Sequence, residues 1–113
     1  MIIEFQCKEL QRCAEDERFA TRHLGVVCAK KYHQRLAQLE ITANFEELRN
    51  AIGRFHELTG DRKGQWSFDL EHPYRLIVTP KTQPIPVDKD GKYIWQEISD
   101  ALIVEIVNYH KEG

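Results

Sequence analysis

The apolar residues of this chain change their spacing about half-way along it, and this change constrains the fold more than any other feature. Between residues 24 and 39 they recur at steps of three and four, which predicts an amphipathic helix over about residues 25–40. Between residues 66 and 79 apolar and polar side chains alternate, as they do in half-buried strands. Helices followed by strands predict an α+β domain.

The first forty residues are expected to form a strand and a helical hairpin. Ile2, Ile3 and Phe5 suit a short strand, and residues 8–22 have a helical pattern. Gly25 is expected to separate this helix from the next one. We expect the hairpin to pack on one face of the sheet that the later strands form.

Four strands are expected in the second half, at residues 54–58, 66–70, 74–79 and 102–107. Short connections favour antiparallel pairing, so the sheet should have four to five strands and be mainly antiparallel. Three prolines interrupt residues 80–100, and Asp90-Gly91 is typical of a hairpin turn, with Tyr93 and Trp95 following at strand spacing. This segment is interpreted as an excursion with a small extra hairpin.

The composition suits one globular domain spanning residues 1–113, with 42% hydrophobic and 30% charged residues. The sequence has neither the run of about 20 apolar residues that a membrane span needs nor a signal-peptide pattern, so we expect a cytoplasmic protein without a membrane partner. Cys7, Cys13 and Cys28 are an odd number without a Cys-x-x-Cys spacing, so neither a disulfide framework nor a zinc site is expected. No cofactor is predicted, and Cys28 is interpreted as a small buried hydrophobe.

The charge is uneven along the chain. The net charge of −2 and the pI of about 6.2 argue against an extended nucleic-acid surface. Five basic residues nevertheless fall in the middle of the chain: Arg54, Arg62, Lys63, Arg75 and Lys81. Because acidic residues concentrate in the last quarter, a local basic patch is compatible with the acidic total.

Three segments carry a resemblance to a known family. They read Arg-Phe-His-Glu-Leu-Thr-Gly-Asp-Arg-Lys-Gly-Gln-Trp at residues 54–66, Tyr-Arg-Leu at 74–76 and Ile-Val-Asn-Tyr-His at 106–110. In this order they resemble the HigB branch of the RelE/ParE toxin superfamily, over about residues 24–110. The resemblance implies a RelE-like fold and the toxin component of a type II toxin–antitoxin system.

The same resemblance implies an enzyme, a metal-independent and ribosome-dependent mRNA endoribonuclease that inhibits translation. The catalytic residues that it implies are His56, Arg75, Tyr109 and His110, and the RNA-binding residues are Arg62 and Lys63. His56 and His110 would transfer protons, Tyr109 would orient the 2′-hydroxyl or stack on a base, and Arg75 would stabilise the phosphate. Histidine titrates near neutral pH and arginine binds phosphate, so these residue types suit metal-independent RNA cleavage.

Each of these residues also has a structural interpretation. Arg75 could pair with Asp69 or Glu105 across the sheet. His56 could be a strand histidine with satisfied hydrogen bonds, and the basic residues of the turn before Trp66 could simply be solvated. Trp66 itself is assigned to the core.

The resemblance implies a helix-turn-helix antitoxin of the HigA type as partner, besides mRNA and the ribosome. An alternative is a non-catalytic binding protein of the same fold, either a gyrase poison of the ParE kind or a degenerate toxin that only binds its antitoxin. His56, Tyr109 and His110 favour the ribonuclease. Thr59 and Asn108 stand where the family commonly has lysine and aspartate, and with the acidic pI they favour the alternative.

Overall fold

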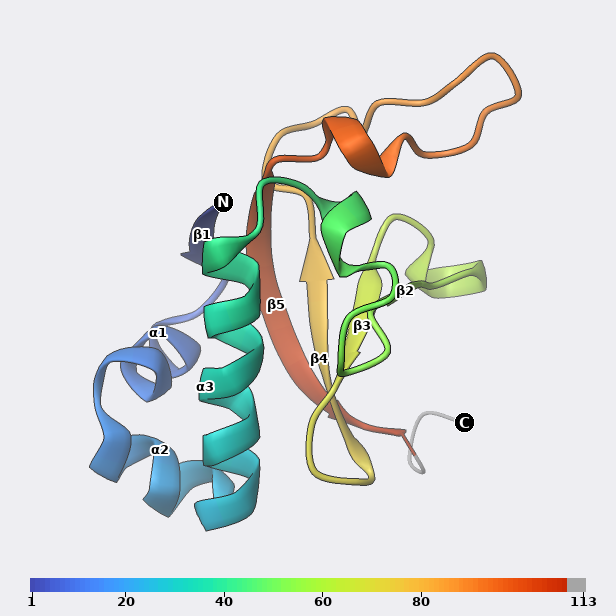
Figure 1. Ribbon diagram of the computed structural model, residues 1–113. Coiled ribbons are helices and arrows are strands. Elements are labelled where there is room, and N and C mark those ends of the chain that lie inside the picture. Colours follow the sequence, from blue (N-terminus) through green and yellow to red (C-terminus); the bar gives the residue numbers. More distant parts are fainter. Residues whose placement is uncertain (110–113) are drawn as a thin grey trace.

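The computed structural model of the protein describes residues 1–109 and confirms the α+β architecture (Figure 1). Its helices and strands, in chain order, are β1 (Ile2–Phe5), α1 (Lys8–Glu15), α2 (Glu17–Leu24), α3 (Val26–Ile41), β2 (His56–Glu57), β3 (Trp66–Asp69), β4 (Tyr74–Thr79) and β5 (Asp100–Asn108). Three short 3-10 turns complete the order: η1 (Phe45–Leu48), η2 (Gly60–Arg62) and η3 (Trp95–Glu97). None of the helices in the described part of the chain is long and apolar enough to cross a lipid bilayer.

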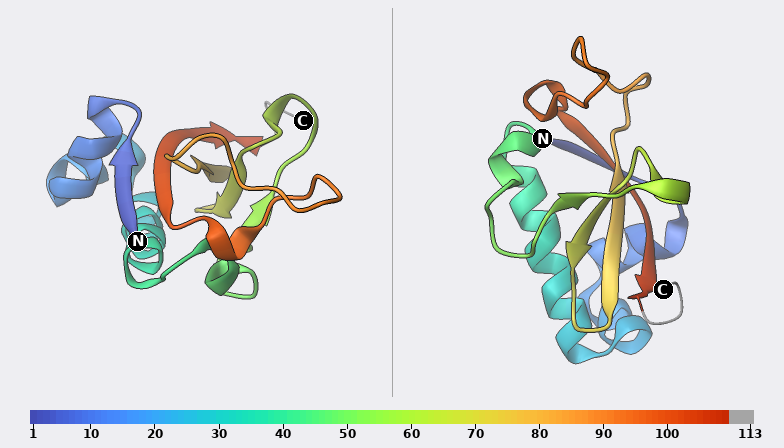
Figure 2. Two further views of the ribbon diagram at one scale, coloured as in Figure 1. Left: turned by 90° about the horizontal axis from the view of Figure 1, so that it is seen from above. Right: turned by 90° about the vertical axis from the view of Figure 1, so that its right-hand side faces the viewer.

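The sheet has five strands in the order β1-β5-β4-β3-β2, and it is mainly antiparallel, as predicted. Only the pairing of β1 with β5 is parallel among the described strands. The last strand therefore lies inside the sheet, beside the central strand β4. The helices gather on one side of the sheet, and α2 packs on α3 (Figures 1 and 2).

The helix predicted over residues 8–22 is two helices, so this part of the prediction was wrong. The chain breaks at Asp16, whose carboxylate accepts a hydrogen bond from the backbone N–H of Phe19, 3.0 Å away. This hydrogen bond caps the first turn of α2 and lowers the pKa of the Asp16 carboxyl below its usual range. Gly25, at a φ of 87°, separates α2 from α3 as expected.

The core lies between the helices and the sheet, and its centre is aromatic. Trp66 is fully buried, as predicted, and the ring of Phe45 lies 5.0 Å from the rings of both Phe55 and Trp66. Both contacts are edge-to-face pairs, which contribute about 0.5–1.5 kcal/mol each beyond the burial of apolar area. Cys28 is also buried, at 2% exposure. The face of the sheet toward the helices is therefore packed against a buried aromatic layer, and the opposite face is left open.

The excursion over residues 80–100 is less regular than predicted. Its hairpin consists of one isolated bridge between Val87 and Tyr93. Trp95 lies in η3 and not at a strand position, because its ring packs 5.7 Å from that of Trp66 in the core. Its Nε1 donates a hydrogen bond to Glu57 of β2, which ties the excursion to the edge of the sheet.

Candidate active site

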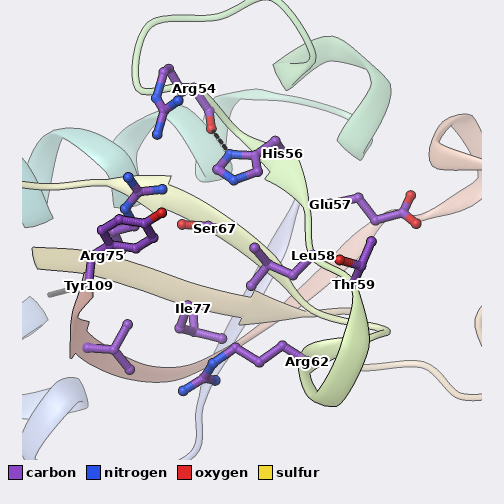
Figure 3. A pocket seen from close by; sticks show the side chains of 11 residues that line it. Arg54, His56, Glu57, Leu58, Thr59, Arg62, Ser67, Arg75, Ile77 and Tyr109 are labelled. Atoms are coloured by element: carbon purple, nitrogen blue, oxygen red, sulfur yellow. Dashed lines mark hydrogen bonds between the residues drawn. The ribbon is translucent and has the colours of Figure 1, made fainter. Parts of the chain in front are cut away.

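A hollow of about 510 Å³ lies on the face of the sheet that the helices leave uncovered (Figure 3). Strand geometry explains its lining, because alternate residues point to opposite faces. Trp66 and Phe68 enter the core, whereas Ser67 between them faces the hollow. Ser67 lies opposite His56 on one side and Ile77 on the other. Residues that are distant in the sequence thus form one row across three strands.

His56 enters the hollow from β2, at the edge of the sheet. Its Nδ1 lies 2.7 Å from the carbonyl oxygen of Arg54 (Figure 3). A carbonyl oxygen only accepts hydrogen bonds, so Nδ1 carries the proton and Nε2 keeps its lone pair in the neutral ring. Arg54 adopts a φ of 49° directly after Gly53 at 109°, and this left-handed turn leads the chain into β2. The geometry leaves Nε2 as the ring atom that can accept a proton.

Arg75 lies on the central strand and belongs to a group of three charges. Asp69 accepts a hydrogen bond of 2.8 Å from Arg54 Nε, and its other oxygen lies 3.9 Å from Arg75 Nη1. The pairing of Arg75 with Asp69 across the sheet, which the sequence also allowed as a purely structural role, is therefore present, but as a long contact of 3.9 Å. The hydrogen bond from Arg54 to Asp69 raises the pKa of the Arg54 guanidinium. Two guanidinium groups share one carboxylate, so the group keeps a net positive charge for an anion.

Tyr109 reaches the same hollow from the end of β5. The guanidinium carbon of Arg75 lies 4.2 Å from the centre of the Tyr109 ring, and Figure 3 shows the two side chains stacked. The backbone N–H of Tyr109 donates a hydrogen bond of 2.9 Å to the carbonyl of Pro73, which fixes the strand end beside the β3–β4 turn. The structure thus brings Tyr109, Arg75 and His56 together. His110, the fourth candidate catalytic residue, lies outside the described residues.

The two candidate RNA-binding residues separate in space. Arg62 lies at the far end of the hollow, where Nη1 donates to Gln65, 2.9 Å away, and lies 3.3 Å from a carboxylate oxygen of Glu105 (Figure 3). Lys63 does not line this hollow but a neighbouring depression. Arg62, the last residue of η2, and Lys63, which follows it, therefore line two different concave surfaces.

Arg54 and Ser67 are among the residues that line the hollow and were not predicted from the sequence as site residues. Arg54 lies inside the motif, but its role depends on its contacts with Asp69 and His56. Ser67 is 1% exposed, and its hydroxyl has no hydrogen-bond partner in the described part of the chain. A serine between the core residues Trp66 and Phe68 marks the opposite face, but only the strand register puts it beside His56.

The described residues contain no group of three or more His, Cys, Asp or Glu side chains placed to hold a metal ion. The set assembled in the hollow can exchange a proton and stabilise an anion.

Comparison with known proteins supports the fold. Neither a protein-family model nor a curated protein matches the sequence. Among solved structures, the chain is similar to the "YoeB/ParE toxin from Agrobacterium tumefaciens", with a TM-score of 0.54 and 10% sequence identity over 94% of this chain and 95% of that one. At this identity the likeness concerns the fold: the chain has the α+β fold of the RelE/ParE-type toxins, as the sequence predicted.

Proposed function

We propose that this chain is the toxin of a type II toxin–antitoxin pair and cleaves mRNA on the ribosome without a metal ion. One observation carries the proposal: His56, with its Nε2 available, shares a hollow with Arg75 and Tyr109 on the open face of the sheet. The RelE/ParE-type fold and the HigB-like motif support the same conclusion.

In the proposed reaction, His56 Nε2 takes the proton of a ribose 2′-hydroxyl. The 2′-oxygen then bonds to the adjacent phosphorus, and the bond from phosphorus to the 5′-oxygen breaks. The products are a 2′,3′-cyclic phosphate and a 5′-hydroxyl, whose proton His110 is proposed to supply. Proton transfer by a positioned side chain contributes about 10²–10⁴-fold to such a rate.

Arg75 is proposed to stabilise the charge of the pentacoordinate phosphate. Its position over the Tyr109 ring restrains the guanidinium, and Tyr109 is proposed to orient the 2′-hydroxyl or stack on a base. Arg62 is proposed to hold the RNA backbone at the other end of the hollow. Because the chain carries a net charge of −2, the ribosome is assigned much of the substrate positioning.

The partner proposed for this toxin is a helix-turn-helix antitoxin of the HigA type, and both would act in the cytoplasm, where mRNA is translated. An antitoxin that covers the hollow would block the ribonuclease directly. A small helix-turn-helix protein encoded beside this chain is the first thing to look for.

The test is induced expression of the chain with measurement of growth and of mRNA ends by primer extension. We expect growth arrest and new ends inside translated codons. We expect mRNA cleavage to fall at least about 100-fold in each of the variants His56→Ala, Arg75→Ala and His110→Ala. Lys89→Ala, on the exposed excursion away from the hollow, is the matched control and should behave as wild type.

The alternative is a non-catalytic binding protein of the same fold. It is favoured by the engagement of the basic groups with carboxylates, since Arg54 contacts Asp69 and Arg62 contacts Glu105. Arrest without new mRNA ends, unaffected by His56→Ala, would point to a bound target such as gyrase. No arrest, with retained antitoxin binding, would identify a degenerate toxin.

A further inference from the structure

A second depression lies directly beside the candidate active site, on the other side of β2. It measures about 650 Å³, and His56 and Glu57 line both concave surfaces. Its basic lining comes from three separate segments, with Arg49 after η1, Lys63 after η2 and Lys92 on the excursion. We propose that this depression binds the RNA backbone next to the scissile phosphate. The inference rests on the ribonuclease function proposed above.

The excursion positions its lysine through a defined turn. Both the backbone N–H of Asp90 and that of Lys92 donate to one carboxylate oxygen of Asp88, at 2.8 and 3.0 Å. At the base, the backbone N–H of Ile94 donates to the carbonyl of Pro86, 2.9 Å away. Asp88 therefore fixes the backbone of this turn, and the turn places Lys92 at the rim of the depression. In Figure 1 this orange loop projects over the same side of the molecule as β2 and η2.

The charges of the depression favour an anion. The carboxylate Glu57 accepts the hydrogen bond of Trp95 Nε1, and Arg49 pairs with Glu46 at 2.8 Å. Lys63 and Lys92 are exposed, and within residues 1–109 neither forms an ion pair. Two ammonium groups without a carboxylate partner, in a protein of net charge −2, are a local arrangement that suits phosphate.

The arrangement of the aromatic side chains indicates which part of the RNA would bind. The guanidinium carbon of Arg49 lies 3.8 Å from the centre of the Trp95 ring and covers that face, and Trp95 is only 8% exposed. A base therefore has no open tryptophan face on which to stack, and the ring of Tyr93, the other aromatic near the surface of the depression, is half-buried against Trp66. The depression would contact phosphates without reading the sequence, and its effect would depend strongly on salt.

The experiment uses 2′-O-methyl RNA, which cannot be cleaved, in lengths of about four and about ten nucleotides. Fluorescence anisotropy gives the Kd for wild type and for the double variant Lys63→Gln/Lys92→Gln at about 50 and 200 mM salt. At about 50 mM salt we expect the variant to bind the longer RNA about tenfold more weakly, and the slope of log Kd against log salt should be reduced by about 1.4, as expected for two lost phosphate contacts. The short RNA should bind both proteins equally.

The control variant Lys30→Gln/Lys89→Gln removes two exposed lysines that lie outside the depression, and it should bind as wild type. Equal binding of the long RNA by Lys63→Gln/Lys92→Gln and wild type, while wild type still cleaves mRNA, would overturn this inference alone. If wild type neither binds the long RNA nor cleaves mRNA, the proposed function fails and the inference with it. A poly-glutamate peptide is the second probe. If Lys63→Gln/Lys92→Gln loses binding to this peptide but binds RNA as wild type does, the depression binds an acidic protein segment and the RNA site is overturned.

Discussion

Arg75 and Tyr109 stack on each other across two antiparallel strands, with 4.2 Å between the guanidinium carbon and the ring centre. The register explains the contact, because Arg75 lies opposite Val107, two residues before Tyr109. Cation–π attraction at a partly exposed site is worth about 0.5–1 kcal/mol, which is enough to restrain a flexible guanidinium. The stack therefore acts as one unit in the hollow.

Changing Tyr109 separates the role of the ring from that of its hydroxyl. Tyr109→Phe keeps the ring beneath Arg75, so it is expected to retain most of the mRNA cleavage. Tyr109→Ala removes the ring, and a misplaced phosphate-binding group can cost about 100-fold in rate. Primer extension after induction measures both. If Tyr109→Phe is as inactive as Tyr109→Ala, a positioning role for the ring is contradicted. The Tyr109 hydroxyl would then be the group that cleavage requires.

Removing the Ser67 hydroxyl is expected to leave the free energy of unfolding unchanged or to raise it. A buried polar group without a partner costs about 1–3 kcal/mol, so Ser67→Ala loses no hydrogen bond and removes that cost. Thr79→Val is the comparison, because the Thr79 hydroxyl donates to the carbonyl of Gly64, 2.7 Å away. It should destabilise the protein by about 1 kcal/mol in urea unfolding. Equal destabilisation by both variants would indicate that Ser67 has a stabilising contact.

Gly53→Ala is expected to destabilise the protein by about 2–4 kcal/mol. A Cβ at this position would lie 2.7 Å from both Arg35 Nε and Phe68 Cε1, and the φ of 109° disfavours any L side chain. Gly91→Ala is the matched control, because its φ of 80° is also unfavourable but a Cβ there meets nothing within 4 Å. In urea unfolding, Gly91→Ala should lower the free energy of unfolding by about 1 kcal/mol. If both variants lose the same free energy of unfolding, the side chains of Arg35 and Phe68 can move to make room for the added Cβ at little cost.

Asp100 is expected to make stability depend on pH in the acid range. Burial alone would raise the pKa of Asp100, but hydrogen bonds from the Thr82 hydroxyl and from the backbone N–H groups of Thr82 and Lys81 outweigh it and hold the pKa below its usual range. Because the pKa of Asp100 is lower in the folded than in the unfolded protein, its ionised carboxylate stabilises the fold fully at a pH above the unfolded-state pKa of about 4. This stabilisation is lost as the pH falls through the folded-state pKa.

The variant that tests this is Asp100→Asn, which should be about 1–2 kcal/mol less stable than wild type at neutral pH. The difference between the two proteins should shrink below about pH 4, as the wild-type carboxyl becomes protonated. Urea unfolding at a series of pH values measures it. A difference that stays constant down to about pH 2 would mean that the charge of Asp100 contributes nothing.

Elements with a strong local pattern were predicted well. α3 and β4 lie within one or two residues of their expected bounds, because each has a continuous period of its own and a clear break at its ends. The break at Asp16 and the 3-10 turn at Trp95 were missed. Each depends on a contact that competes with the local pattern, a capping hydrogen bond in one case and burial of an indole ring in the other.

The sequence by itself determined the α+β class, the order of a strand, a helical region and four further strands along the chain, and the candidates His56, Arg75 and Tyr109, because periodicity and motif are local properties. Only the tertiary structure decided that these three share one hollow, that Lys63 belongs to another depression, and that Ser67 lies opposite His56. Those relations depend on strand order and register. They arise from packing between segments of the chain, and no local pattern encodes the register of β2 against β3 or the position of β5 between β1 and β4.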